Sequence, residues 1–370
     1  MFRLTIPPIG DDEIQACVRV LREGQLVHGE ECRLFEQELA EYIGVKEAVV
    51  VSSGTAALHL ALIALGIGPG HAVLVPDFTF PATANVVELV GARPVFIDVN
   101  RGNYNMSVDL LRDAIRTWQG PETLKAIMPV HEFGCPADMT AINSIALEHN
   151  LSVVEDAACA LGASLNGKKI GSFGDCACFS FHPRKTLTTG EGGAIATNNP
   201  KVAERLRLLR SHGMQPQKDG IHFMLPGYNY RLTNFQAAMA RVQLKKLDDW
   251  IEERRQIQAE YRRLLTDCSR ISVPVDCDGH SWQTFMTVID PAIDRNRVMA
   301  DLKEAGIETN LGAQCVHSQD YYLHKYPDQC ELLGHNNAHL LFRCGLALPL
   351  YQGLAKADLT NITDCLKRVL

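Results

Sequence analysis

The chain lacks the features that mark membrane, nucleic-acid-binding and disulfide-stabilised proteins. Its most apolar stretch, AALHLALIALGIG at residues 56–68, is too short to span a bilayer and contains His59. The residues after Met1 lack the apolar core of a secretory signal. The formal net charge of −7 leaves no basic excess with which to bind polyanions in general. We therefore expect a cytoplasmic protein with no membrane and no nucleic-acid partner.

Metal and nucleotide motifs are also missing. The 12 cysteines are scattered, and the one close pair, Cys176 and Cys178, has no second pair that would complete a zinc site. We therefore predict no metal site and reduced thiols. No G-x-x-x-x-G-K-[ST] sequence occurs, and GIGPG at residues 66–70 follows a helical pattern rather than a strand. Neither a P-loop nor a dinucleotide-binding turn is expected.

What the chain does have is an alternation of short apolar runs with helical patterns. The runs EAVVVSS, AVLVPD, RPVFIDV, KAIMPVHEFG and SVVEDAA begin at residues 47, 72, 93, 125 and 152. Continuous apolar strands between helices predict an α/β fold whose mostly parallel sheet is covered on both faces. Two further strands, CACFSFH and GGAIATN, are too close for a helical crossover, so a tight turn that contains Lys185 should join them.

The pattern changes after Thr233. The sequence NFQAAMARVQLKKLDDWIEERRQIQAEYRRLL predicts one long charged helix, with Thr233 or Asn234 as its N-cap. No linker rich in Gly, Ser or Pro separates the parts on either side. We predict a large α/β domain over residues 1–233, a connecting helix over 234–265 and a smaller C-terminal α+β domain over 266–370.

Lys185 lies between an apolar strand and a glycine-rich turn, where an amine can be presented as a nucleophile. A lysine of this kind most often forms a Schiff base with pyridoxal phosphate. That cofactor needs a carboxylate for its ring nitrogen, backbone donors at a helix N-terminus for its phosphate, and a flat side chain against its ring. Asp156 at the end of SVVED could be the carboxylate, and a solvated turn aspartate is the alternative.

The other two requirements also have candidates at strand ends. Ser53, Gly54 and Thr55 lead from a strand into a helix, although an ordinary turn with Thr55 as N-cap explains them equally well. Phe78 and Phe80 lie at another strand end, where a core position is the alternative to stacking on a ring. All of these residues are expected at one edge of the sheet.

Longer segments of the chain resemble the DegT/StrS-type sugar aminotransferases. The similarity covers nearly the whole chain, and its most specific segments are SSGTAALHLAL, PVHEFGCPADM, VVEDAACALGA, GSFGDCACFSFHPRKTLTTGEGG and GYNYRLTNFQAAMARVQL. The resemblance implies a pyridoxal-phosphate-dependent transferase of the aspartate-aminotransferase type (fold type I). It also implies a homodimer with shared active sites.

The resemblance assigns roles residue by residue. Lys185 would form the Schiff base and later carry the proton between substrate and cofactor, and Asp156 would pair with the ring nitrogen. The remaining cofactor contacts would be the Gly54 and Thr55 amides, the Ser180 hydroxyl, the Phe80 ring and, from the other subunit, Asn229. Arg231 lies in the same matched segment as Asn229 but receives no role.

One position departs from the family pattern. The family carries Gln or His, which can bond near the phenolic oxygen of the cofactor, where this chain has Cys159, a weaker donor. Cys159 is either a filler of space or a functional thiol. Relatives that dehydrate their substrate replace the lysine by histidine. Lys185 is present, and His182 does not substitute for it, so transamination is favoured.

The resemblance implies a ping-pong transfer of an amino group from glutamate, which leaves 2-oxoglutarate, to a keto-sugar joined to a nucleoside diphosphate. His317 would lie near the sugar, and Arg210 would either reach the same site or be a surface arginine. Relatives make amino sugars for lipopolysaccharide or antibiotics, and some act on keto-inositols. A cyclitol ketone is therefore an alternative acceptor, and a regulatory protein that retains the cofactor pocket without turnover is an alternative of another class.

Overall fold

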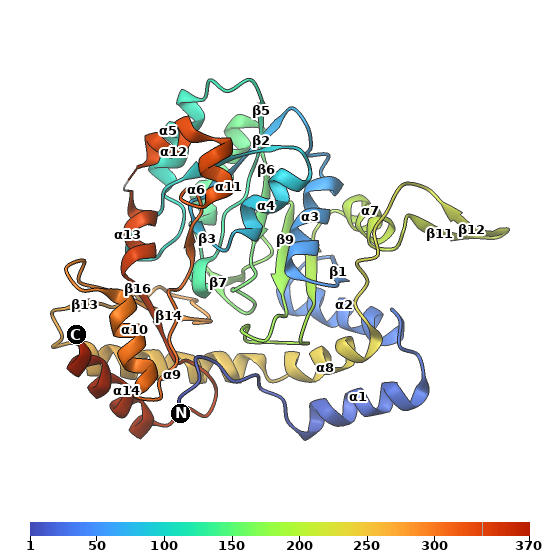
Figure 1. Cartoon of the computed structure of the whole chain (residues 1–370). Helices are drawn as coiled ribbons and strands as arrows, with labels where there is room; N and C mark the ends of the chain where they lie inside the picture. The colour runs from blue at the N-terminus through green and yellow to red at the C-terminus, as the bar shows by residue number, and fades with distance from the viewer. Residues whose placement is uncertain (335) are drawn as a thin grey trace.

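The computed structural model describes residues 1–334 and 336–370, and its centre is a seven-stranded sheet (Figure 1). The strand order is β1-β10-β9-β6-β5-β2-β4, and only β10 runs antiparallel to its neighbours. The strands are β1 (Glu47–Val51), β2 (His71–Pro76), β4 (Arg93–Ile97), β5 (Thr123–Ile127), β6 (Ser152–Asp156), β9 (Cys176–Ser180) and β10 (Gly193–Thr197). The predicted α/β class and the mostly parallel sheet are confirmed.

Helices cover both faces of this sheet, which explains why its strands are continuously apolar. In β1, Val49 and Val51 pack into one buried cluster with Leu60, whereas Val50 packs into the opposite cluster with Phe35. The first face is covered by α3 (Gly54–Ala64), α4 (Ala82–Leu89) and α7 (Pro200–Arg210). The second is covered by α2 (Glu30–Ile43), α5 (Val108–Thr117), α6 (Met139–His149) and α8 (Asn234–Leu244).

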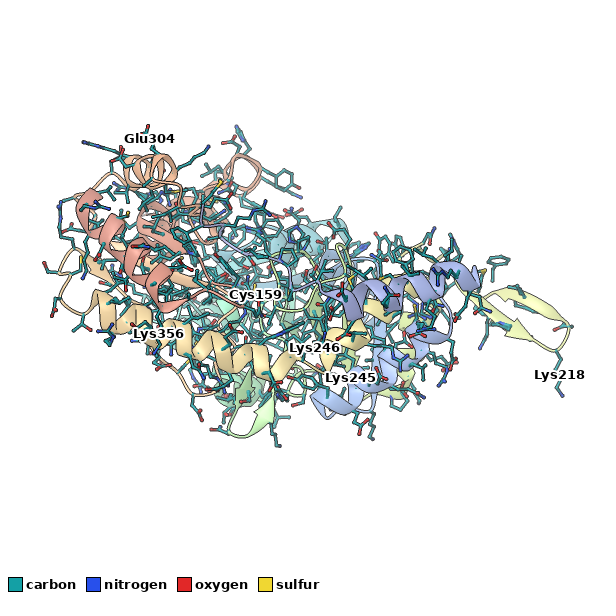
Figure 2. The ribbon with its side chains drawn as sticks, turned by 90° about the horizontal axis from the view of Figure 1, so that it is seen from below. Cys159, Lys218, Lys245, Lys246, Glu304 and Lys356 are labelled. Atoms are coloured by element: carbon teal, nitrogen blue, oxygen red, sulfur yellow. The ribbon has the colours of Figure 1, made fainter. Side chains whose placement is uncertain are left out.

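The connecting segment is two helices, so the prediction of one long helix over residues 234–265 is wrong. Thr233 is the N-cap of α8, as expected, and its N–H donates to the Gln236 side chain at 3.2 Å. A turn at Lys245 and Lys246 then interrupts the regular helix, and α9 (Leu247–Leu265) begins (Figure 2). The Lys246 ammonium bonds Asp12 and Glu13 of α1 (Asp11–Glu23), at 2.9 Å each, which fixes the break against a third helix.

The C-terminal part has its own core around an antiparallel sheet of β13 (Ile271–Ser272), β14 (Phe285–Ile289) and β16 (Gly345–Leu348). It contains α9, α10 (Arg295–Glu304) and α14 (Lys356–Val369). The smaller elements are β3 (Phe78–Thr79), η1 (Glu132–Gly134), β7 (Ser164–Leu165), β8 (Lys168–Lys169), β15 (Gln314–Cys315), α11 (Asp320–Lys325), α12 (Pro327–Leu333) and α13 (Asn337–Cys344). The domain boundaries at residues 233 and 265 stay a prediction.

A two-stranded hairpin of β11 (Met214–Gln217) and β12 (Gly220–Phe223) projects from the main body (Figure 1). Lys218 lies at its tip, far from Cys159 in the middle of the molecule (Figure 2). None of the helices in the described part of the chain combines the length and the apolar character that crossing a bilayer requires.

Candidate active site

Lys185 lies in the loop of residues 181–192, which joins β9 to β10. The antiparallel pairing of these strands is confirmed, but the connection is a folded loop rather than a tight turn. The Phe181 N–H donates to the Gly192 carbonyl at 2.8 Å, and the Phe181 carbonyl accepts from the Thr188 hydroxyl at 2.8 Å. Gly190 has a φ of 79°, a conformation that side chains disfavour. The loop therefore holds the base of Lys185 in one place.

A pocket of about 330 Å³ opens beside this loop at the carboxyl edge of the sheet. Asp156 ends β6, Ser180 ends β9, and Gly54 follows β1 by a short turn, which is the expected arrangement for ligand contacts. The pocket brings together seven residues singled out in the sequence, namely Gly54, Thr55, Phe80, Asp156, Cys159, Ser180 and Lys185.

Asp156 is a buried carboxylate with its own hydrogen-bond partners, not a solvated turn residue. The Thr83 hydroxyl donates to Oδ2 at 2.8 Å, and the Ala158 N–H donates to Oδ1 at 3.2 Å. Burial raises the pKa of Asp156 above its usual range because the charged form loses hydration. A protonated ring nitrogen in the pocket would compensate that loss.

The N-terminus of α3 forms an anion cradle. Ser53 is its N-cap, and its hydroxyl accepts the Ala56 N–H at 3.0 Å, so Thr55 is not the cap. The first two amides of the helix, from Gly54 and Thr55, lie at the pocket. A Cβ on Gly54 would approach the Ser180 Cβ to 2.8 Å, so glycine is needed for this close approach.

Three further side chains complete the part of the pocket expected from the sequence. The Phe80 ring lines the pocket and is 63% exposed, whereas Phe78 is fully buried. Phe78 is therefore a core residue, and Phe80 is the candidate for stacking on a ring. The Lys185 ammonium lies 3.0 Å from the Cys159 sulfur. Burial raises the pKa of the Cys159 thiol, which keeps it neutral.

Glu132 is a pocket residue that the sequence analysis missed. It belongs to η1, directly after the β5 region, and its carboxyl is buried against the pocket. Burial, reinforced by the charge of Asp156, raises the pKa of Glu132 to about 8. The signal in the sequence was a single acidic residue within the strand-end segment PVHEFG.

Arg210 and His317 do not reach this pocket. Arg210 is buried rather than a surface arginine, because Nη1 bonds Glu36 at 2.5 Å and the Val50 carbonyl at 2.9 Å. The His317 Nδ1 lies 2.5 Å from Asp77 Oδ2. Burial opposes a charged ring, but Asp77 raises the pKa of His317 overall. Arg210 thus links α7 to α2 and β1, and His317 links the segment after β15 to Asp77 after β2.

Asn229 is exposed on the segment after the β11–β12 hairpin and does not line the pocket of its own chain. Its backbone forms an isolated bridge with Ser211. The structure therefore gathers every sequence-predicted cofactor residue except Asn229, which was assigned to the site of another subunit.

The donor set fits pyridoxal phosphate. A helix N-terminus and the Ser180 hydroxyl suit the phosphate, the Asp156 carboxylate suits a protonated pyridine nitrogen, and Lys185 supplies an amine for the aldehyde. The missing side chain at Gly54 lets Ser180 pack closely against the start of α3, so the Ser180 hydroxyl lies beside the first amides of that helix. The residues present therefore match the cofactor in charge and in shape.

Comparison with known proteins agrees with this geometry. The model of the DegT/DnrJ/EryC1/StrS aminotransferase family matches residues 7–367. GDP-perosamine synthase of Caulobacter vibrioides is 40% identical over 341 residues, which cover 91% of this chain and 89% of that protein.

Solved structures agree as well. PseC of Helicobacter pylori, an aminotransferase involved in the biosynthesis of pseudoaminic acid, superposes with a TM-score of 0.92 at 26% identity and covers 100% of this chain and 98% of its own. The PLP form of Spr1654 from Streptococcus pneumoniae gives a TM-score of 0.88 at 27% identity, with the same coverage. The chain belongs to the DegT/DnrJ/EryC1/StrS family and is a pyridoxal-phosphate-dependent aminotransferase.

Proposed function

We propose that the enzyme transfers the amino group of glutamate to a keto-sugar joined to a nucleoside diphosphate. The observation that carries this proposal is the placement of Lys185 and Asp156 in one pocket with the N-terminus of α3. The similarity to GDP-perosamine synthase supports the nucleotide-linked sugar. The exposed Arg184 lines the same pocket, and its positive charge favours an anionic substrate.

Each pocket residue then has a defined task. When bound, pyridoxal phosphate supplies an electron sink that allows an amino group to be exchanged. Lys185 Nζ would hold the cofactor and, once released, accept the proton from the substrate carbon that bears the amino group. Asp156 would keep the proton on the ring nitrogen, and the Gly54 and Thr55 amides would hold the phosphate. The Phe80 ring would shield one face of the cofactor from water.

An absorbance spectrum before and after addition of glutamate tests the donor. We expect the yellow band of the lysine-linked cofactor to bleach with glutamate and to return when a nucleotide-linked keto-sugar is added. Bleaching that is reversed only by a keto-inositol would replace the acceptor, and a band that glutamate leaves unchanged would remove glutamate as donor.

The cradle at Gly54 gives a testable prediction. Gly54→Ala should weaken binding of pyridoxal phosphate by at least about tenfold, because the new Cβ would lie 2.8 Å from the Ser180 Cβ. Gly68→Ala is the matched control, because its Cβ meets only the Val90 carbonyl at an ordinary 3.5 Å. Titration of the cofactor-free proteins with pyridoxal phosphate, followed by absorbance, measures both affinities. Equal affinities would show that the phosphate is held elsewhere.

We also propose that the enzyme works as a homodimer in the cytoplasm. Ile221, Phe223 and Met224, on and beside the projecting hairpin, expose between 54% and 69% of their surface, which suits a protein interface. The twelve free cysteines suit a reducing compartment. Asn229 follows this segment and would reach the phosphate of the cofactor bound to the partner.

Subunit mixing tests the shared site. Asn229→Ala and Lys185→Ala should each lose most activity alone, whereas a refolded mixture of the two should regain activity. In a hybrid dimer one of the two sites receives an intact Lys185 from one chain and an intact Asn229 from the other. An equal mixture should recover about a quarter of wild-type activity, because about half of random dimers are hybrids with one intact site each. Recovery that stays at the sum of the two single variants would contradict the shared site.

A further inference from the structure

Glu132 is held rigidly at the pocket wall. Its backbone N–H donates to Asn105 Oδ1 at 2.9 Å, and Asn105 Nδ2 donates to the carbonyls of Cys135 and Pro136 at 3.1 and 3.0 Å. The next residue, Phe133, has a φ of 56°, a conformation that its neighbours must enforce. A turn tied at three points by one buried amide fixes where the Glu132 carboxyl lies.

One oxygen of this carboxyl is unused. Glu132 Oε2 is buried and has no hydrogen-bond partner among the residues that the structure describes. A buried polar atom without a partner is costly, so its presence in a pocket indicates that a ligand satisfies it. The side chain is 4% exposed, so solvent does not satisfy this oxygen.

The charges around Glu132 keep its proton in place. Burial is the largest effect and raises the pKa to about 8. Asp156 also acts to raise it, whereas Lys185, a hydrogen bond from the Thr79 side chain and one from the Phe133 backbone act to lower it. The titratable and charged side chains that line the same pocket are Asp156, Cys159, His182, Arg184, Lys185 and Glu191. At neutral pH Glu132 is therefore a neutral carboxylic acid with an O–H to donate.

The pocket also has a position that lacks its expected donor. Cys159 stands where the family pattern has Gln or His near the phenolic oxygen of the cofactor, and a thiol donates only weakly. The Cys159 sulfur is 3.0 Å from Lys185 Nζ, which places it beside the group that holds the cofactor. A missing donor and a carboxylic acid with one unpartnered oxygen thus occur in one pocket.

We infer that Glu132 donates its carboxyl proton in a hydrogen bond to the phenolic oxygen of bound pyridoxal phosphate, the role that Cys159 fills poorly. This inference rests on the cofactor-holding role proposed for Lys185. No covalent bond changes: the O–H of Glu132 is the donor and the phenolic oxygen is the acceptor. Glu132 is then a residue that contacts the cofactor and sets its electronic state.

The sign of the effect follows from charge. The Schiff-base nitrogen and the phenolic oxygen lie next to each other on the cofactor, and loss of the nitrogen proton leaves more negative charge on the oxygen. A neutral donor at that oxygen stabilises the deprotonated form and lowers the pKa of the Schiff base. An ionised Glu132 would do the opposite, because its negative charge would stabilise the protonated nitrogen.

A pH titration of the absorbance of the cofactor-loaded protein tests this inference without any turnover. Glu132→Leu removes the donor and should raise the Schiff-base pKa by about one unit, a tenfold change in proton affinity. Glu132→Gln offers an N–H donor and should stay near the wild-type value. Cys159→Ala should shift the pKa much less than Glu132→Leu does, because a thiol donates only weakly. Glu191→Gln, which changes an exposed acid of the same pocket, should leave the pKa unchanged.

Each other outcome overturns the inference in a distinct way. A pKa that falls in both Glu132 variants would mean that the carboxyl is ionised, and an unchanged pKa in both would mean that it makes no contact with the cofactor. A shift in Cys159→Ala as large as that expected for Glu132→Leu would return the role to the thiol. If Glu132→Leu does not fold, Glu132→Ala takes its place, because it also removes the donor and should also raise the Schiff-base pKa. A wild-type protein without the yellow band would instead contradict the role of Lys185.

Discussion

Lys185→Ala should abolish the lysine-linked absorbance band and reduce amino transfer by about 10³-fold or more. The substitution removes both the amine that would hold the cofactor and the base that would move the substrate proton, and loss of positioned proton transfer alone costs about 10²–10⁴-fold. Non-covalent binding of the cofactor should persist, because Asp156 and the N-terminus of α3 are untouched. Absorbance and single-turnover assays with glutamate measure these effects.

The control for this prediction is Lys168→Ala, which changes an exposed lysine in the β7–β8 hairpin. It should retain the band and full activity. If the band survived in Lys185→Ala but was lost in Lys168→Ala, the covalent link would be formed by Lys168 and not by Lys185. Melting curves of the two cofactor-free variants should differ little, since the Lys185 side chain bonds only the Cys159 sulfur among the hydrogen-bond partners described.

Local signals in the sequence predicted the edge of the sheet and most of the pocket. Strands such as β1 and β6 are buried on both faces, so their apolar runs are unbroken, and the residues that follow them must lie at one edge. Lys185 and Asp156 were found in this way, each from the strand before it. Their chemical roles came from the family resemblance, because position alone left ordinary turn residues as alternatives.

The residues that escaped prediction depend on partners far away in the chain. The turn that holds Glu132 is fixed by Asn105, and the side chain of His317 is bound by Asp77, 240 positions before it. Arg210 pairs with Glu36 on α2, which lies 174 positions away in the sequence. No local pattern encodes such pairs, so a buried ion pair and a surface arginine look the same in the sequence.

The break between α8 and α9 was not predicted from the sequence for a related reason. The helical periodicity of residues 234–265 is continuous, and nothing in it breaks a helix, such as Pro or Gly. The interruption at Lys246 coincides with its bonds to Asp12 and Glu13, which come from the other end of the chain. Tertiary contacts thus override a favourable local pattern.

Asp156→Asn should separate cofactor loading from catalysis. The new side chain has the same shape, and the Thr83 hydroxyl can accept from the amide as readily as it donates to the carboxylate, so the pocket should keep its form. The negative charge that would hold the proton on the ring nitrogen is lost. We expect kcat to fall by about 10²–10³-fold, the usual cost of removing one preorganised electrostatic contact. The yellow band should remain, because Lys185 is intact.

Stability distinguishes this catalytic role from a structural one. Because burial raises the pKa of Asp156, the folded protein binds its proton more tightly than the unfolded chain, and this contribution to stability is lost as pH rises. Cofactor-free Asp156→Asn should therefore melt no lower than wild type at neutral pH. The melting temperature of the variant relative to wild type should rise from acidic to neutral pH. Thr83→Val keeps the charge and removes only the hydroxyl, so its activity should fall much less. A stable Asp156→Asn protein with activity within tenfold of wild type would mean that another group protonates the ring nitrogen.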